Sequence, residues 1–485
     1  MEIRTGEGHG VARNAIYLLS GKIISTVLGV IFVIYVAIQL GLTQFGIYTL
    51  GNYFAGLFVI LGDLGLGNYT TREIARDKNN AQDILNRVFC LRLVLSLLAF
   101  IIGITVLLFV DYGLLTEQLT MIILFTHIFF RSFLSFLFHI FEGFERMEFI
   151  TIAEAFRRGI DLVIGVWVLS QGYGLTFLIL GLVLSDLIIL TFTWMLLYSS
   201  LPIRLRIVFS SINWYETLVS SIPFGLLLVF LGVINSIDTI MLAKIRGEDE
   251  VGLYGVVIRI TSVLTIIPLM TATAMFPAIS RLYNTSIDKA RSIFLNLIRL
   301  MMFLGMPIAF GTTLIGSSLI VFIYDATYLP AAMPLKIVIW SIGIVFLNLP
   351  MIMFLSSIER QKQATMIIGI SALSNILLNL VLIPKYGMVG AAITTVISQV
   401  IIFILCYRRI IDFLEHLEWI PYFTQAVIGC LGMSLVLWFL PTVHSGVLIF
   451  LGGISYLSIM ILIGALNRQD WHHIINLFNP NKLSS

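Results

Sequence analysis

The chain has 485 residues, of which 59% are hydrophobic and only 11% are charged. Soluble domains carry about 25% charged residues, so this composition excludes an ordinary soluble globule and indicates a polytopic membrane protein. The net charge of +3 is distributed over many short segments and does not indicate nucleic-acid binding. The three cysteines have no paired spacing, so no disulfide framework, metal site or cofactor is predicted.

Apolar stretches long enough to cross a hydrocarbon core, which needs about 20 residues, recur along the whole chain. We therefore predict an all-α membrane protein with about fourteen transmembrane helices. The stretch 1–13 is polar and the apolar run after it is too long for a signal core, so no cleaved signal peptide is expected. The predicted spans are residues 14–40, 45–68, 88–110, 119–140, 150–170, 175–198, 213–237, 251–278, 292–322, 332–356, 364–383, 388–407, 419–440 and 445–466.

Most of the 29 basic residues fall in alternate loops, and Arg157 and Arg158 are counted with them. The opposite loops hold only Lys244, Arg246 and Lys385. Because Lys and Arg are enriched in cytoplasmic loops, we expect a protein of the cell membrane with both termini in the cytoplasm. An even number of spans agrees with this orientation.

Six basic residues fall within the predicted spans or at their mouths. Arg92 and Lys336 lie about one turn inside, where a long side chain can reach the headgroups. The other four lie on the order of 10–13 Å deep, at about 1.5 Å per residue. At that depth a water-filled interior is favoured, with an intramembrane ion pair as the alternative. These four candidates for a substrate cavity are Lys22, Arg131, Arg259 and Arg299.

Acidic residues inside the spans are the second group of site candidates. Asp186 lies near the middle of its span, where an isolated charge is most costly. Asp63 and Asp238 lie near span ends and are either cavity residues or interfacial ones. Asp161 follows Arg157 at one-turn spacing, so a local helix pair explains it. The four candidate cations, in contrast, suit an anionic diphosphate, because Arg supplies a bidentate fork and Lys a point charge.

The chain contains a weak internal repeat. Phe45-Gly46-Ile47-Tyr48 opens the second predicted span, and Val251-Gly252-Leu253-Tyr254 opens the eighth. Leu91-Arg92-Leu93 is echoed by Ile298-Arg299-Leu300. The second copy of each motif lies six spans after the first, so the two copies have the same orientation in the membrane. This predicts two parallel six-helix lobes with a site between them. The predicted division is residues 1–200 and 201–412 for the lobes, 413–466 for two further helices and 467–485 for a cytoplasmic tail.

Prolines distinguish the two predicted lobes, because the second contains several inside its spans and the first six spans contain none. Pro268 and Pro277 bracket a small, hydroxylated stretch in the span 251–278. Proline removes a backbone donor and bends a helix. We expect this span to be bent, either as a flexible element of alternating access or as a static kink.

Several stretches together resemble one family of transporters. They include Lys22 followed by a Gly- and Val-rich helix, LGLTQFGIYTL, GDLGLGNYTTREIAR, the segment from Asp238 to VGLYG, MFPAISRLY and LIPKYGMVGAAITTVISQ. In order and spacing they resemble the polysaccharide-transport, O-antigen flippase-like branch of the multidrug/oligosaccharidyl-lipid/polysaccharide (MOP) exporter superfamily. The resemblance implies two helical lobes around a central cavity with alternating access. It also implies that Lys22, Asp63, Asp238 and Arg259 fall on cavity-wall positions.

The resemblance implies a flippase that moves an oligosaccharide on a polyprenyl phosphate or pyrophosphate from the cytoplasmic to the outer leaflet. Its expected partners are this lipid, membrane lipids and glycan polymerases or glycosyltransferases of the same pathway, with the protein itself a monomer. The peptidoglycan-precursor branch usually carries arginines in its first span, where this chain has only Lys22. A cation-coupled multidrug exporter of the same superfamily is the alternative, and it would depend on acids such as Asp63 and Asp186. A membrane glycosyltransferase is disfavoured because the first outer loop, roughly 39–44, has no acid.

Overall fold

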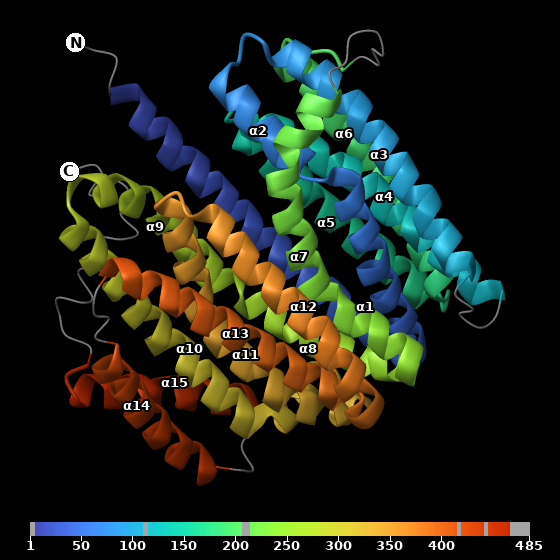
Figure 1. The fold of residues 1–485 in the computed structure, drawn as a ribbon. Coiled ribbons are helices and arrows are strands. Elements are labelled where there is room, and N and C mark those ends of the chain that lie inside the picture. The colour runs from blue at the N-terminus through green and yellow to red at the C-terminus, as the bar shows by residue number, and fades with distance from the viewer. Residues whose placement is uncertain (1–4, 110–114, 206–213, 415–418, 441–444, 466–485) are drawn as a thin grey trace. The chain divides into compact units, whose positions relative to one another are not determined.

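The computed structural model describes residues 5–109, 115–205, 214–414, 419–440 and 445–465. Within these ranges the chain is helical and contains no β-strand, which confirms the predicted fold class (Figure 1). The helices are α1 (Thr5–Asp63), α2 (Leu66–Arg76), α3 (Ala81–Phe109), α4 (Leu115–Gly143), α5 (Met147–Ser170), α6 (Leu175–Ser200), α7 (Trp214–Arg246), α8 (Glu248–Leu264), α9 (Ile266–Thr285), α10 (Ile287–Ile323), the 3-10 helix η1 (Ala326–Ala331), α11 (Ala332–Ser357), α12 (Gln361–Tyr386), α13 (Met388–Leu414), α14 (Ile420–Trp438) and α15 (Ser445–Leu462).

Twelve stretches of the described residues are long and apolar enough to cross a membrane. One of them includes most of α1, although non-helical dihedral angles at Gly41 divide that helix into the first two predicted spans. α5 is not among the twelve because acidic and basic residues cluster in its middle. With α1 counted twice and α5 included, the helices correspond to the predicted set of about fourteen.

The second predicted span ends earlier than expected. α1 stops at Asp63, and Leu64 and Gly65 have left-handed backbone angles, with φ of 42° and 81°. The Asp63 carboxylate accepts from the backbone amides of Gly65 and Gly67, both at 3.2 Å, and so caps the helix that follows. The basic segment with Arg72 and Arg76, which follows this turn, is the short amphipathic helix α2 and not a loop.

The predicted bend in the span 251–278 is confirmed. α8 ends at Leu264 and α9 begins at Ile266, so the helix breaks just before Pro268. Proline has no amide hydrogen, and the carbonyl four residues before it cannot receive the usual helical bond. Whether this bend flexes during transport stays a prediction.

The chain forms two compact units, Met1–Gly252 and Leu253–Ser485. The first unit extends through α7, whereas the repeat predicted a lobe boundary at residue 200. α7 contacts α1 and closely approaches the turn that follows it: a Cβ on Gly65 would lie 2.5 Å from the Ser221 carbonyl, and one on Gly225 would lie 2.5 Å from the Leu64 carbonyl. The division into lobes at 200 and 412 stays a prediction based on the repeat.

Inside the first unit, the two copies of the repeat motif meet each other. A Cβ on Gly46 would collide with the Glu248 carbonyl oxygen, and one on Gly252 would collide with the Leu42 carbonyl oxygen. The two contacts are reciprocal, because Leu42 and Glu248 hold equivalent positions in the two copies of the repeat, as do Gly46 and Gly252. The Thr43 hydroxyl also donates to the Asp249 carboxylate at 2.6 Å. Parallel repeats would produce this symmetric crossing if the equivalent segments of the two copies packed against each other.

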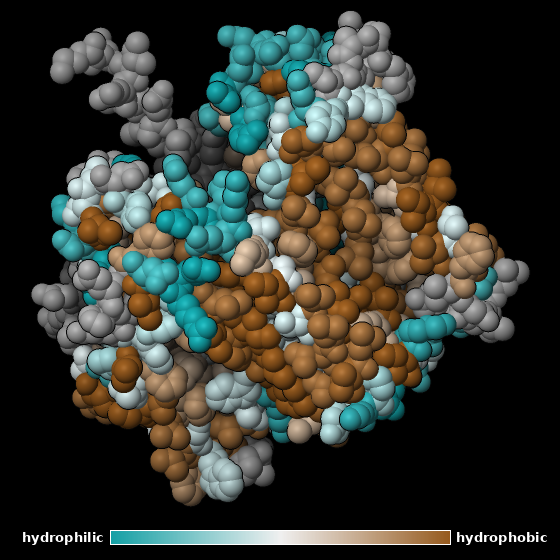
Figure 2. Space-filling view, viewed as in Figure 1, coloured by the Kyte–Doolittle hydropathy of each residue, from teal (hydrophilic) through white to brown (hydrophobic). Residues whose placement is uncertain are grey.

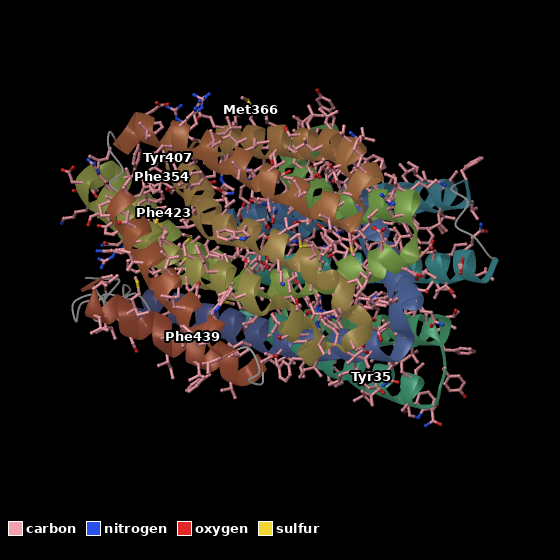
Figure 3. The ribbon with its side chains drawn as sticks, turned by 90° about the horizontal axis from the view of Figure 1, so that it is seen from below. Tyr35, Phe354, Met366, Tyr407, Phe423 and Phe439 are labelled. Atoms are coloured by element: carbon pink, nitrogen blue, oxygen red, sulfur yellow. The ribbon has the colours of Figure 1, made fainter. Side chains whose placement is uncertain are left out.

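Surface hydropathy follows the helices. In Figure 2 the visible face of the first unit is apolar along its long helices and polar at the end where α2 lies. In the second unit, Phe354 is fully buried, whereas Met366 is 58% and Phe439 is 78% exposed (Figure 3). Large exposed apolar side chains on long helices are the expected surface of a protein that faces lipid.

Candidate functional site

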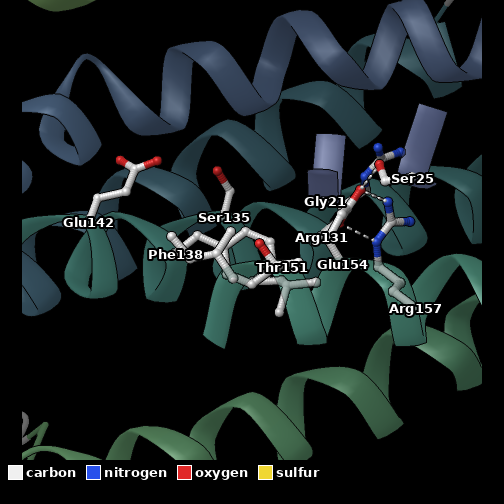
Figure 4. Close-up of a pocket in the computed structure, with 11 residues that line it drawn as sticks. Gly21, Ser25, Arg131, Ser135, Phe138, Glu142, Thr151, Glu154 and Arg157 are labelled. Atoms are coloured by element: carbon white, nitrogen blue, oxygen red, sulfur yellow. Dashed lines mark hydrogen bonds and ion pairs between the residues drawn. The ribbon is translucent and has the colours of Figure 1, made fainter. Parts of the chain in front are cut away.

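A cavity of about 330 Å³ lies inside the first unit, between α1, α4 and α5 (Figure 4). It runs along α4 from Arg131, near the middle of that helix, to Glu142 at its end. At about 1.5 Å per residue this is on the order of 16 Å. The remaining lining residues are Gly21, Ser25, Leu134, Ser135, Phe138, Ile150, Thr151, Glu154 and Arg157.

Small residues on α1 allow α5 to approach and form one wall of the cavity. A Cβ on Gly21 would lie 2.7 Å from the Thr151 hydroxyl, so the glycine is needed for this contact. One turn later the Ser25 hydroxyl donates to Glu154 at 3.2 Å. Interhelical contacts through small and hydroxylated residues are typical of membrane helices, and here they place Glu154 at the cavity.

α5 carries a buried charge network behind that wall. Arg157, only 2% exposed, donates to Glu154 at 2.6 and 3.0 Å and to Asp161 at 2.9 Å. The other Asp161 oxygen accepts from Ser185 of α6 at 2.7 Å. Arg158 adds an ion pair with Glu154 at 3.5 Å. The predicted pairing of Asp161 with Arg157 is confirmed, and the assignment of Arg157 to a loop is wrong.

Arg131 differs from these arginines. Its side chain lines the cavity, and among the described residues no hydrogen bond or ion pair to it occurs within bonding distance. It does lie within electrostatic range of Arg157, Glu154, Asp161 and Asp186. Arg157 is already paired with two carboxylates, so among the described lining residues Arg131 supplies a cation to a ligand in this cavity.

Asp186 is 1% exposed and lies close to His127 of α4. The His127 Nδ1 and the Asp186 Oδ2 are 2.6 Å apart, and the histidine side chain is 4% exposed. His127 precedes Arg131 by one helical turn, so the pair stands beside the cavity but does not line it. The structure therefore gives Asp186 a buried partner that the sequence did not identify.

Asp63 has a structural role that the sequence did not assign. It forms an ion pair with Arg92, which is 2% exposed and also donates to the backbone and hydroxyl oxygens of Ser132, both at 3.0 Å. The Arg92 guanidinium also lies 5.1 Å from the ring centre of Phe136. The expectation that Arg92 reaches the headgroups is wrong, because Asp63 and the Ser132 carbonyl hold its buried guanidinium inside.

Arg299 and Arg259 belong to the second unit. Arg299 donates to the carbonyl of Ala465 at 2.5 Å, and its guanidinium lies 5.4 and 5.2 Å from the rings of Phe303 and Tyr422. It therefore connects α10 to α14 and to the end of α15. Arg259 is partly buried on α8. Its role as a cavity residue stays a prediction.

The remaining two candidates are on α1 and α7. Lys22 lies on α1 between the lining residues Gly21 and Ser25, but its side chain falls outside the described part of the structure. Asp238 is buried on α7, with 5% of its surface exposed. The structure thus brings Arg131 and Asp186 into one region of the first unit, and it places Asp63 in a separate structural contact.

Glu154 and Arg157 line the cavity but were not among the predicted site residues. Their signal was present, since Glu154, Arg157, Arg158 and Asp161 recur at helical spacing within one predicted span. Opposite charges three or four residues apart neutralise one another on a helix. Such a group is compatible with a buried helix and does not have to mark a loop.

The sequence matches a family described as polysaccharide biosynthesis protein over residues 11–283, more than half of the chain. The chain belongs to this polysaccharide biosynthesis protein family. A second match, to the family called MatE, covers residues 223–381. Together these matches confirm the MOP exporter superfamily, and within it the polysaccharide-flippase branch.

Two curated relatives match part of this family member. An uncharacterized membrane protein of Methanocaldococcus jannaschii is 28% identical over 239 residues, which are 47% of this chain and 46% of the relative. The probable flippase AglR of Haloferax volcanii is 26% identical over 206 residues, 41% of this chain and 43% of the relative. The chain thus matches less than half the length of either relative.

The fold of this family member is similar to solved transporter structures. The lipid II flippase MurJ, in an inward-closed conformation, superposes with a TM-score of 0.77 at 15% sequence identity. The match covers 92% of this chain and 98% of that one. At this identity the likeness shows the fold.

Proposed function

We propose that this protein is a flippase for a lipid-linked oligosaccharide. Its substrate is a glycan on a polyprenyl phosphate or pyrophosphate, which moves from the cytoplasmic to the outer leaflet of the cell membrane by alternating access. The family membership, the similarity to a probable flippase and the fold support this proposal. The observation that carries it is the cation Arg131 in the cavity of the first unit.

The cavity suits the phosphate end of such a lipid. Arg131 offers a guanidinium fork, which binds phosphate oxygens in a bidentate manner. Ser135 and Thr151 add hydroxyl groups to the lining. A volume of about 330 Å³ is at the lower end of small-molecule sites, which span about 300–1,000 Å³. It can hold a diphosphate with part of a sugar, while the polyprenyl tail remains in lipid.

The direction of transport follows from the orientation. The loop that follows α4 lies on the side predicted to be cytoplasmic, and the cavity extends toward that end of α4 as far as Glu142. A head group that enters from the cytoplasm would pass Glu142 first and reach Arg131 deeper in the unit. Both termini are proposed to be cytoplasmic on the same argument.

Translocation in proteoliposomes tests this proposal. A fluorescent polyprenyl-pyrophosphate disaccharide serves as the probe, and quenching from outside reports its leaflet. Arg131→Gln removes a charge-assisted bond of about 1.5–3 kcal/mol, so the translocation rate at subsaturating probe should fall about 10- to 100-fold. Arg131→Lys should retain part of the rate. Arg76→Gln, which removes an exposed cation of α2, should leave it unchanged.

Equal rates in wild type, Arg131→Gln and Arg76→Gln would refute the anion site. A fall of the same size in both variants would show a general charge effect and would also count against it.

A cation-coupled multidrug exporter is a second candidate, because the MatE match covers residues 223–381 and two carboxylates, Glu142 and Glu154, line the cavity. Glu154 is already engaged by Arg157 and Arg158, which reduces its availability to a cationic drug. Drug accumulation in cells that express the protein separates the candidates. An exporter lowers accumulation without changing the cell's glycans, and a flippase does the reverse.

A further inference from the structure

One face of α4 lines the cavity from its deep end to its rim. Arg131, Ser135, Phe138 and Glu142 follow one another at intervals of three or four residues, so they form a single stripe on the helix. Figure 4 shows Arg131 and Glu142 on opposite sides of the cavity, with Ser135 and Phe138 between them. The stripe therefore presents a cation, a hydroxyl, an aromatic ring and a carboxylate in that order, toward the end of α4 predicted to be cytoplasmic.

Phe138 differs from the other phenylalanines of α4. Six others lie on this helix, and each of them packs against at least one aromatic ring. They are Phe125, Phe129, Phe130, Phe133, Phe136 and Phe141. Among the described aromatic residues, none makes a ring contact with Phe138, which is partly buried and lines the cavity. An aromatic face at a cavity wall is a surface on which the C–H groups of a sugar ring pack.

Glu142 is held through one carboxylate oxygen while the other faces no donor. The Thr71 hydroxyl of α2 lies 3.3 Å from Oε2, and the His139 Nδ1 lies 2.9 Å from the same atom. α2 comes this close because Gly67 has no side chain: a Cβ there would lie 2.3 Å from the His139 ring. Oε1 receives no hydrogen bond from a described residue. A carboxylate fixed in this way accepts charge-assisted hydrogen bonds from sugar hydroxyls.

The spacing of the stripe separates the phosphates of a lipid-linked glycan from its sugars. Arg131 and Glu142 lie on the order of 16 Å apart along the helix, which is longer than a diphosphate. With the diphosphate at Arg131, the groups that reach Phe138 and Glu142 therefore belong to sugars. Glu142 is 33% exposed, so the glycan can continue past it out of the cavity.

Charge at the rim of the cavity has one sign among the described lining residues. The other charged lining residues, Arg131, Glu154 and Arg157, lie together at the deep end (Figure 4). An acidic sugar at the rim therefore meets the like charge of Glu142. Like charges brought together in a binding site disfavour the partner that carries them.

We infer that this stripe of α4 selects the glycan as well as the phosphate. Phe138 stacks on a sugar ring close to the diphosphate, and Glu142 accepts from hydroxyls farther along the glycan. The sugars in these positions carry no acidic group. Thr71 and His139 are positioning residues, since they hold the Glu142 carboxylate without lining the cavity. This inference rests on the proposed function, because it takes a lipid-linked glycan as the substrate.

Paired translocation measurements in proteoliposomes test the inference. The probes are two fluorescent polyprenyl-pyrophosphate disaccharides that differ only in the second sugar, which is glucose in one and glucuronic acid in the other. At subsaturating probe, wild type should move the glucose probe about tenfold faster, because the glucuronate meets Glu142. Glu142→Gln should reduce this ratio to about threefold or less, by moving the glucuronate probe faster than wild type does.

Glu145→Gln is the matched control. Glu145 lies just after α4, but it is 63% exposed, pairs with Lys78 and does not line the cavity. This variant should keep the wild-type ratio. Phe138→Leu should slow both probes about 2- to 10-fold, the range expected for an aromatic contact, without changing their ratio. Phe138→Tyr keeps the ring and should retain the wild-type rates.

Calorimetry of the full-length protein in nanodiscs, with inorganic pyrophosphate as the probe, checks that the deep end is intact. Glu142→Gln and Phe138→Leu should bind pyrophosphate as wild type does, because the diphosphate lies at Arg131. Weaker binding in either variant would show a distorted cavity and would count against a separate sugar site.

Equal rates for the two probes in wild type, or the same ratio in wild type and Glu142→Gln, would overturn this inference and leave the flippase in place. An equal fall of the ratio in Glu145→Gln would also overturn it, because it would show a general effect of surface charge. If wild type moves neither probe faster than protein-free liposomes, the proposed function fails and the inference fails with it.

Discussion

The ion pair of Arg92 and Asp63 gives a sharp prediction about stability. Arg92→Met keeps the length of the buried side chain but removes the ion pair, two bonds to Ser132 and the contact with Phe136. Loss of one partner of a buried ion pair costs about 3–5 kcal/mol. Asp63 is 13% exposed and retains two backbone amides, so its charge is not left fully unpaired. We therefore expect a loss near the lower limit, about 3 kcal/mol.

Equilibrium unfolding by SDS in mixed micelles measures this loss. Asp63→Asn and the double variant complete a cycle, which should give a coupling energy of about 1–3 kcal/mol. Arg87→Met is the control, because Arg87 lies on the same helix and, among the described residues, donates to the carbonyl of Asp83 at 3.3 Å. It should change stability by less than about 0.5 kcal/mol. Additive single effects of Arg92→Met and Asp63→Asn would refute the pairing.

Two further predictions concern the repeat and the appended helices. Gly252→Ala places a Cβ against the Leu42 carbonyl and should destabilise the protein by about 1–3 kcal/mol, whereas Gly56→Ala, with nothing within 4 Å, should not; equal unfolding curves in SDS would contradict the close crossing. Arg299→Met should raise hydrogen exchange at the end of α15, since it removes the bond to Ala465, and should leave pyrophosphate affinity unchanged. If Arg299→Met instead lowered pyrophosphate affinity without faster hydrogen exchange at the end of α15, Arg299 would be a cavity residue.

The sequence predicted the helices well because hydropathy and span length depend on local composition. The helix ends at Ser200, Ile323 and Ser357 lie within about two residues of the predicted edges, the usual uncertainty of helix boundaries. The early end of α1 was not predicted, because it depends on the Asp63 side chain capping the next helix. Composition alone cannot indicate whether a carboxylate at a span end caps, pairs or faces water.

The site was predicted only in part, because depth along a helix does not determine which neighbour a side chain meets. Arg131 and Arg299 have similar predicted depths, yet one lines a cavity and the other binds a carbonyl 166 residues later. The repeat gave a hint, since Arg92 and Arg299 occupy equivalent positions and both donate to a backbone carbonyl of another helix. His127 gave no signal, because its acidic partner lies on another helix.

Glycan analysis in the native host tests the central claim most directly. Cells that lack the gene are complemented with wild type, Arg131→Gln or Arg76→Gln, and the surface glycan and the lipid-linked precursor are measured together. We predict that Arg131→Gln, at wild-type protein level, fails to restore the surface glycan and accumulates precursor, while Arg76→Gln restores both to normal. A normal surface glycan in the deletion strain, or full rescue by Arg131→Gln, would contradict a flippase that holds its substrate through this cation.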